Sequence, residues 1–177
     1  LRTDGSQYAV GQASYRPGLP EGGAEALYPE AGKVAVLGLL AGDYDSFSDA
    51  AQVEFSLDED GGLGSELAFG DFDGDGEDEI IYGDYNGFIH VLNLDGSELI
   101  DDNFPFDTGN QVWGAMAGAD MDSDGLMDIA VVSKSKHFYL LDKNGIKVDF
   151  NSEKYLLGTP AIGNLDGDPD LEVVFSG

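Results

Sequence analysis

A nine-residue pattern of acidic side chains occurs twice in this chain, and its spacing limits the fold more than any other feature. The pattern is DFDGDGEDE at residues 71–79 and DMDSDGLMD at residues 120–128, and a related segment, NLDGDPDLE, lies at residues 164–172. Carboxylates on alternate residues of a tight turn can converge on one point, and Ca²⁺ takes about six to eight oxygen ligands. We therefore expect loops that bind Ca²⁺ as the cofactor.

The residue at loop position six distinguishes the third loop from the other two. Gly76 and Gly125 occupy this position in the first two loops, and glycine permits the positive φ that folds a turn back over an ion. Position seven then contributes only its backbone carbonyl. The third loop has Pro169 at position six. Because proline fixes φ at about −65°, we expect this loop to turn differently and to hold an ion most weakly.

The residues after each loop exclude an EF-hand. An EF-hand needs a bidentate Glu at position twelve and a following helix, but position twelve is Tyr82 in the first copy and Val131 in the second. Short apolar runs rich in β-branched residues follow instead, at 80–82 and 129–132. Such runs are typical of buried strands. The sequence therefore predicts calcium loops between strands.

The repeat extends well beyond the loops. Sixteen residues after Ile80 align without a gap with sixteen residues after Ile129, and both copies end in a turn dipeptide, Asp95-Gly96 or Asn144-Gly145. Such dipeptides are preferred where both residues need φ above zero. The loops begin 49 residues apart, at 71 and 120, and then 44 residues apart, at 120 and 164. A period of about 40 to 50 residues with four short strands is typical of propeller blades.

The predicted fold class is all-β, with β-propeller blades of four antiparallel strands and a calcium loop between the first and second strand. One unit has expected strands at 66–70, 79–83, 88–94 and about 104–106, and the next at 113–119, 128–133, 137–141 and 147–150. Segments 33–40 and 52–57 supply two further strands. About three blade equivalents result.

At this level of detail the chain resembles the FG-GAP or VCBS type of repeat, the calcium-binding blade of integrin α-subunit heads and of bacterial surface proteins. Three segments carry the resemblance: Phe69-Gly70-Asp71, Gly118-Ala119-Asp120 and Ile162-Gly163-Asn164, each with the loop that follows. The resemblance implies side-chain ligands at loop positions one, three, five and nine and a carbonyl ligand at position seven. The implied metal ligands are Asp71, Asp73, Asp75, Glu77 and Glu79; Asp120, Asp122, Asp124, Leu126 and Asp128; and Asn164, Asp166, Asp168, Asp170 and Glu172.

The predicted blades do not complete a ring. We expect an extended arm or linker at 1–32, a half blade at 33–64, blades at 65–110 and 111–157, and a half blade at 158–177. Residues 1–32 are either such an arm, packed through its tyrosines, or the start of a fragment. Propellers have about four to eight blades. The chain is therefore expected to be a fragment of a longer polypeptide or a protomer that completes its ring with other chains.

Composition limits the partners and the compartment. The chain has 35 acidic and 8 basic residues, a net charge of −27 and no cysteine. Such a surface repels nucleic acid and anionic lipid, which are bound through Lys and Arg. The lack of cysteine excludes disulfides and thiol catalysis. No apolar run is long enough for a membrane span. We expect an exported protein, extracellular, cell-surface or periplasmic.

Several other residues have ordinary structural interpretations. His90 and His137 are expected to be packing or surface residues of strands, because neither has a further zinc ligand nearby. Trp113 is expected to pack between blades rather than to stack on a sugar. No pair among Asp84, Asp101, Asp102 and Asp107 is singled out as a glycosidase dyad in so acidic a chain. We therefore assign no catalytic residue.

The repeat, the loops and the charge are compatible with two functions. The first is a non-catalytic, calcium-stabilised propeller module that serves structure, adhesion or assembly at the cell surface, with a protein or glycan ligand, or further copies or blades of the same protein, as partner. The second is the propeller part of a secreted polysaccharide-degrading enzyme. Such an enzyme would need a basic subsite for an acidic glycan, and the only local excess of lysine is at Lys134, Lys136, Lys143, Lys147 and Lys154.

Overall fold

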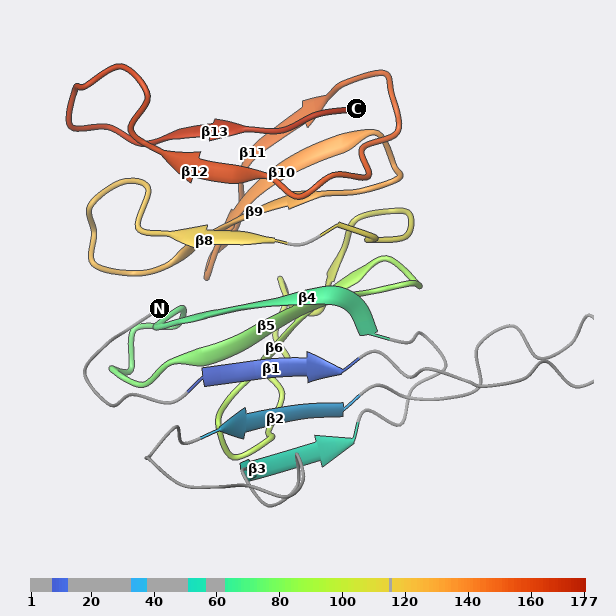
Figure 1. Ribbon diagram of the computed structural model, residues 1–177, viewed down its shortest axis with the longest axis vertical. Helices are drawn as coiled ribbons and strands as arrows, with labels where there is room; N and C mark the ends of the chain where they lie inside the picture. Colours follow the sequence, from blue (N-terminus) through green and yellow to red (C-terminus); the bar gives the residue numbers. More distant parts are fainter. Residues whose placement is uncertain (1–7, 13–32, 38–50, 57–62, 115) are drawn as a thin grey trace, which may run out of the picture. The chain divides into compact units, whose positions relative to one another are not determined.

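The computed structural model describes residues 8–12, 33–37, 51–56, 63–114 and 116–177, with side chains from residue 67 onward. The chain divides into two compact units, Leu1–Leu63 and Gly64–Gly177. Every regular element among the described residues is a β-strand (Figure 1). The strands form four separate sheets. The all-β class predicted from the sequence is therefore confirmed.

The first unit contains a three-stranded sheet with the order β1-β2-β3. Its strands are β1 (Tyr8–Gln12), β2 (Lys33–Leu37) and β3 (Ala51–Ser56). Strands β2 and β3 correspond to the expected strands at 33–40 and 52–57. Strand β1 differs from our expectation of an arm or linker, because it pairs antiparallel with β2, with Tyr8 opposite Leu37. A five-residue strand within a Gly- and Pro-rich stretch is too short to give a periodic signal.

From β4 onward the chain forms two four-stranded sheets and one two-stranded sheet, each with sequential strand order. The first comprises β4 (Leu63–Gly70), β5 (Glu79–Asp84), β6 (Phe88–Leu92) and β7 (Phe106–Asp107). The second comprises β8 (Ala117–Ala119), β9 (Asp128–Val132), β10 (His137–Asp142) and β11 (Gly145–Asn151). Strands β12 (Ala161–Gly163) and β13 (Glu172–Val174) form the last sheet. This repeated four-stranded antiparallel unit is the predicted blade pattern.

Two strands of the second unit are shorter than the sequence predicts by at least two residues. Strand β8 begins at Ala117 rather than at Trp113. At Gly114 a Cβ atom would lie only 2.5 Å from the carbonyl oxygen of Gly158, so a close backbone approach replaces sheet pairing there. Strand β6 ends at Leu92 because a turn follows, in which the amide of Gly96 donates to the carbonyl of Asn93, 2.9 Å away.

The two hairpin turns also differ from prediction. We expected φ above zero at both residues of Asp95-Gly96 and of Asn144-Gly145. Within these two pairs, the glycines have positive φ, 85° at Gly96 and 104° at Gly145, and Asp95 and Asn144 do not. Each turn therefore takes an ordinary right-handed conformation before a single left-handed glycine, which is the geometry of a longer hairpin loop.

The second strand of each four-stranded sheet is the most buried. All six residues of β5 and all five residues of β9 are buried. Both strands carry a continuous run of apolar, mostly β-branched residues, and such runs suit a strand covered on both faces. The first residue of each strand is an acid, Glu79 or Asp128. The core thus begins directly at the last residue of each acidic loop.

A methionine and two glycines join the two four-stranded sheets of the second unit. Met127 lies at the end of the second acidic loop and is buried. A Cβ atom at Gly70 in β4 would lie 2.8 Å from its Sδ atom, and one at Gly118 in β8 would lie 2.5 Å from the same atom. Met127 therefore fills space that both glycines leave open. This contact fixes the end of one acidic loop against the strand that precedes the other.

The two-stranded sheet packs on the second four-stranded sheet through an apolar cluster. Phe175 stacks on Phe138 with ring centroids 4.6 Å apart. Ile162 and Val173 also pack against the cluster that contains Val132 and Phe138. The third acidic loop, between β12 and β13, is thereby attached to the same unit as the first two.

Candidate metal centres

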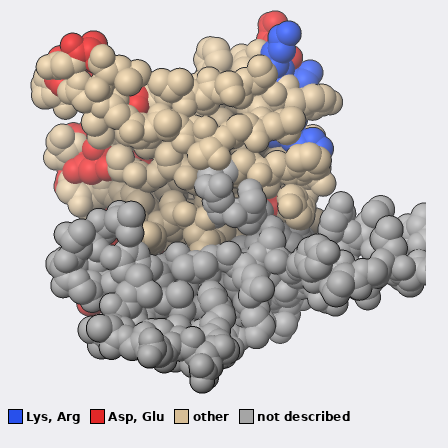
Figure 2. Space-filling model, viewed as in Figure 1, with Lys and Arg blue, Asp and Glu red and all other residues tan. Residues whose placement is uncertain are grey.

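Each acidic loop connects the first and second strand of a sheet, as predicted. The first loop joins β4 to β5, the second joins β8 to β9 and the third joins β12 to β13 (Figure 1). On the face in Figure 2, acidic side chains gather along the side of the second unit where the second and third of these loops project. The repeated sheet topology therefore places equivalent carboxylates at equivalent sites.

Three carboxylates converge in each loop. In every case one oxygen of each lies within 4.8 Å of the others, in the sets Asp71, Asp73 and Glu79; Asp120, Asp122 and Asp128; and Asp166, Asp168 and Glu172. The first two sets are loop positions one, three and nine. The third set uses positions three, five and nine, because position one is Asn164. The predicted residues Asp75 and Asp124 at position five lie outside their sets.

The acid at position nine has two roles. Glu79 is 1% exposed and accepts the amide of Phe72 at 2.8 Å and the amide of Asp73 at 3.3 Å through Oε2. Asp128 is 2% exposed and accepts the amide of Met121 at 2.9 Å. In both loops this buried carboxylate holds the loop start and also faces the other two carboxylates.

The carboxylates at the remaining positions shape the loop backbone. Asp71 accepts the amide of Gly74 at 2.8 Å, and Asp120 accepts the amide of Gly125 at 2.9 Å. Asp75 and Asp124 each accept the amide of the residue two positions later, Glu77 or Leu126, at 2.8 Å. In the third loop the amide of Asp170 donates to Asp168 at 2.9 Å. The bonds that span two residues are Asx-type turns, and together with the longer ones they bend the loop backbone locally.

Two positions of the loop backbone carry the turn. Position six has positive φ where glycine is present, 92° at both Gly76 and Gly125, as predicted. Position four also has positive φ in all three loops, at Gly74 (88°), Ser123 (62°) and Gly167 (88°), which was not predicted from the sequence. Aligning the loops shows Gly, Ser and Gly at this position, so the signal was present. The third loop keeps the bend at position four and lacks the one at Pro169.

The donor set fits Ca²⁺. All three loops offer oxygen donors only, and hard oxygen ligands in a flexible turn suit this ion better than they suit softer metals. The first loop would hold it through Asp71, Asp73 and Glu79 together with Asp75 and the carbonyl of Glu77. Bound Ca²⁺ would neutralise converging negative charge and hold the loop closed. A cleft of about 290 Å³ lies beside this loop and is lined by Asp75, Glu77 and Glu79 and by residues 93–95, which follow β6.

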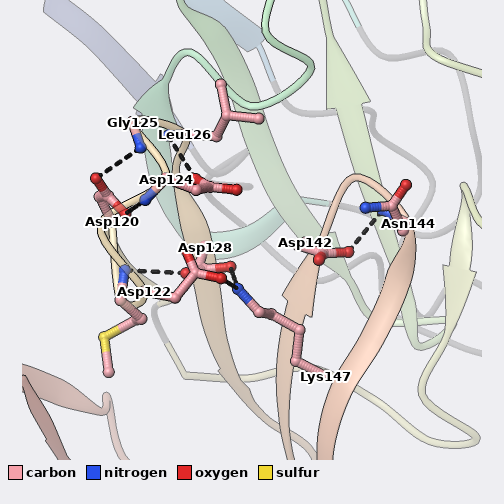
Figure 3. A network of polar contacts seen from close by, with 10 residues as sticks. Asp120, Asp122, Asp124, Gly125, Leu126, Asp128, Asp142, Asn144 and Lys147 are labelled. Carbon is pink, nitrogen blue, oxygen red and sulfur yellow. Dashed lines mark hydrogen bonds and ion pairs between the residues drawn. The ribbon is translucent and has the colours of Figure 1, made fainter.

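A lysine whose position was not predicted from the sequence lies inside the second loop. The Nζ atom of Lys147, from β11, is 2.7 Å from Asp122 Oδ2 and 2.8 Å from Asp128 Oδ1 (Figure 3). Burial alone would lower the pKa of Lys147, but hydrogen bonds to these two carboxylates raise it well above its usual range. The same lysine lowers the pKa of Asp122. The Lys147 ammonium therefore lies between two carboxylates and offsets their negative charge.

Buried charge also affects the first loop. Burial raises the pKa of Glu79, although the amides of Phe72 and Asp73 act in the opposite direction. The neighbouring acids Asp73 and Asp75 raise it further. A lysine from the other sheet, Lys143, reaches this loop, but its Nζ contacts the backbone carbonyl of Asp73 at 3.1 Å rather than a carboxylate.

A second polar cluster surrounds His90 on β6. Its Nδ1 lies 2.5 Å from Glu98 Oε1 and its Nε2 lies 3.6 Å from Asp84 Oδ2. The imidazole stacks on Tyr82 with ring centroids 4.7 Å apart. His137 forms a comparable ion pair with Asp149 and stacks on Tyr139. Both histidines are thus held in strands by ion pairs and aromatic contacts.

Trp113 is 47% exposed and lies before β8. Its ring contacts Tyr85 of the preceding sheet at 6.3 Å, and the ammonium of Lys134 lies 4.2 Å from its centroid. The expected contact between blades is therefore present, although half of the indole faces solvent.

A family-model comparison covers the first two loops. Residues 71–131 match the model of the FG-GAP-like repeat. The matched range begins at Asp71, the first acid of the first loop, and ends within β9, so it covers one repeat and the following loop. The segment is therefore similar to an FG-GAP-like repeat, which confirms the resemblance predicted from the sequence.

None of the curated proteins compared matches the chain. Among solved structures, the chain is similar to the one titled "Crystal structure of BBS1N in complex with ARL6DN, soaked with lead", with 13% identity and a TM-score of 0.48. The alignment covers 73% of this chain and 38% of that chain. The described residues contain no helix with the length and apolar character needed to cross a membrane.

Proposed function

We propose that this chain is a non-catalytic, calcium-stabilised β-propeller module of an exported or cell-surface protein, serving structure, adhesion or assembly. One observation carries the proposal: in three equivalent loops, three carboxylates approach within 4.8 Å of one another. Carboxylates so close together repel each other, and a divalent cation removes that repulsion. Bound calcium would therefore stabilise the loops and the blades that carry them.

The blade division of the chain is part of the same proposal. Residues 65–110 and 111–157 would be whole blades, and 33–64 and 158–177 half blades. The division of the chain into two compact units after Leu63 supports the first of these boundaries. Partners would be a protein or glycan ligand, or further copies or blades that complete the assembly.

The proposed location rests on charge and ion availability. Weak calcium sites, with dissociation constants on the order of 10⁻⁴–10⁻³ M, are filled in extracellular media and empty in the cytosol. A net charge of −27 disfavours nucleic acid as a partner. An acidic, calcium-dependent module therefore suits the cell surface or the periplasm.

Thermal unfolding in calcium and in chelator tests the calcium part of this proposal. A ligand that binds only the folded state adds about 2.7 kcal/mol per site at 100 times its dissociation constant. We expect a clear fall in melting temperature in chelator, reversed by calcium and only weakly by magnesium. Equal melting temperatures in chelator and in calcium would contradict the proposal.

A second experiment tests the absence of catalysis. Acidic and neutral polysaccharides are incubated with the calcium-loaded chain, and both glycan binding on an array and release of new reducing ends are measured. A binding module gives retention on the array without new reducing ends. Release of reducing ends that depends on the chain would instead support the enzyme alternative.

A further inference from the structure

The second acidic loop contains a cation supplied by the chain itself. Lys147 Nζ contacts the position-three acid Asp122 at 2.7 Å and the position-nine acid Asp128 at 2.8 Å. These are two of the three carboxylates that converge in this loop. Figure 3 shows the Lys147 side chain reaching up from β11 toward the same group of oxygens. A calcium ion bound by the same two carboxylates would have to share them with the ammonium or displace it.

The two carboxylates that Lys147 contacts differ in burial. The side chain of Asp128 is 3% exposed, whereas that of Asp122 is 48% exposed. A buried carboxylate without a counter-ion is strongly unfavourable. Lys147 supplies that counter-ion in the absence of a metal. The loop can therefore stay closed, with Asp128 still accepting the amide of Met121 at 2.9 Å.

The first loop has no equivalent lysine. In the repeat, the residue 49 positions before Lys147 is Glu98, and its carboxylate pairs with His90 at 2.5 Å instead. Within the described part of the chain, no lysine pairs with Asp71, Asp73 or Glu79. Among the described residues, the partners of the buried Glu79 carboxylate are the amides of Phe72 and Asp73. Both loops have Asp at positions one, three and five. A lysine pairs with two carboxylates of the second loop, whereas in the first loop Lys143 contacts the backbone carbonyl of Asp73.

We propose that Lys147 is an internal counter-ion that keeps the second loop folded without calcium and makes this loop bind calcium more weakly than the first. This inference rests on the proposed calcium function. Two equivalent loops then respond to different calcium concentrations: the first fills first and is the one whose closure depends on the ion. The second fills only when calcium displaces the ammonium from Asp122 and Asp128.

The test removes the contribution of the first loop and changes the lysine of the second. Asp73→Asn disables the first loop, and Lys147→Met removes the ammonium while keeping side-chain length. Calcium binding is measured by calorimetry for Asp73→Asn alone and for Asp73→Asn with Lys147→Met. We expect the lysine substitution to tighten calcium binding by about tenfold or more, since a positive charge a few ångströms from the ion is removed.

Three controls accompany this measurement. Lys147→Arg keeps the charge and should keep the weak affinity. Lys154→Met, on an exposed residue away from the loops, should change nothing. Lys147→Met should also melt at a lower temperature than the unchanged chain in chelator, with the difference recovered in calcium.

The outcomes separate the inference from the proposed function. Calcium binding to the second loop with the same dissociation constant in the presence and absence of Lys147 would overturn the inference and leave the calcium function intact. Loss of stability in chelator without any change in calcium affinity would also overturn it. Absence of calcium binding to the unchanged chain and to every variant would overturn both.

Discussion

Glu79 accepts a hydrogen bond from the backbone amide of Phe72 at 2.8 Å. This bond links the first residue of β5 to the start of the first acidic loop and so closes the loop. The bond recurs in the other two loops, between Asp128 and Met121 at 2.9 Å and between Glu172 and Leu165 at 2.6 Å. The position-nine acid therefore shapes the loop as well as facing the other carboxylates. Its structural and ionic roles can be separated by substitution.

Glu79→Gln keeps an oxygen acceptor for the Phe72 amide and removes the charge. We expect its stability in chelator to stay close to that of the unchanged chain, while most of the calcium response of the first loop is lost. Glu79→Ala leaves the buried amide unpaired, which costs about 1–3 kcal/mol in addition. Urea unfolding in chelator and in calcium measures both effects. A full calcium response in Glu79→Gln would show that this acid is not a ligand.

Substitution at position three tests whether an acidic residue in the loop contributes more to stability in calcium than an acidic residue elsewhere. Asp73→Ala removes one of three converging carboxylates of the first loop, so we expect it to lose most of the stabilisation that calcium gives there. Asp102→Ala removes an exposed acid outside every loop and should have little effect. Melting temperatures in calcium compare the two. Equal losses would contradict the loop assignment.

The contact of Gly83 in β5 with Val112 is close. A Cβ atom at Gly83 would lie 2.6 Å from Val112 Cγ1, and Val112 is fully buried. Gly83→Ala should therefore destabilise the fold by about 1–3 kcal/mol, as overpacking of a core does. In the Val112→Ala background the same substitution should cost much less. Urea unfolding of both single variants and the double variant gives the coupling, and strict additivity would rule out this contact as the cause.

His90 lies between two acids, and their effects on its pKa predict a pH dependence. Burial alone would lower the pKa of His90, but Asp84 and Glu98 outweigh burial and raise it above 6.5. For Asp84, burial would raise the pKa, but His90 and the amides of Phe88 and Gly87 outweigh burial and lower it below 3.8. The histidine therefore stabilises the fold below pH 6.5 and this stabilisation is lost as pH rises through its folded-state pKa. The Asp84 contribution is instead lost in acid, as pH falls through its lowered pKa.

His90→Gln tests this pH dependence. We expect it to destabilise the chain more at about pH 5.5 than at about pH 8.5, because the protonated imidazole is present mainly at the lower pH. The comparison is made in chelator so that calcium binding does not contribute. An equal loss at both pH values for His90→Gln would contradict the ion-pair account.

Local sequence signals predicted most of the loop positions. The spacing of Asp71, Asp73 and Glu79 places these acids around one turn, independently of the rest of the fold. The apolar run after Glu79 indicates a buried strand. The same reasoning found the loops at Asp120 and Asn164. Both four-stranded sheets were therefore predictable from a single repeat unit.

Long-range register was not predictable in the same way. Lys147 enters the second loop only because β11 lies at the right register on β10, with Ile146 opposite Leu141. Alternation along a strand indicates which face a residue takes, but not which loop a long side chain reaches. The pairing of β1 with β2 is another contact between distant segments, without a signal in the intervening sequence.

Calorimetric titration with calcium, and separately with magnesium, tests the central claim most directly. We predict calcium binding at the first and second loops, with the first tighter and with affinities in the weak range, on the order of 10⁻⁴–10⁻³ M. Magnesium should bind far less well, because it demands a smaller and more regular oxygen shell. A calcium stoichiometry of zero, or magnesium binding as tight as calcium binding, would contradict the account.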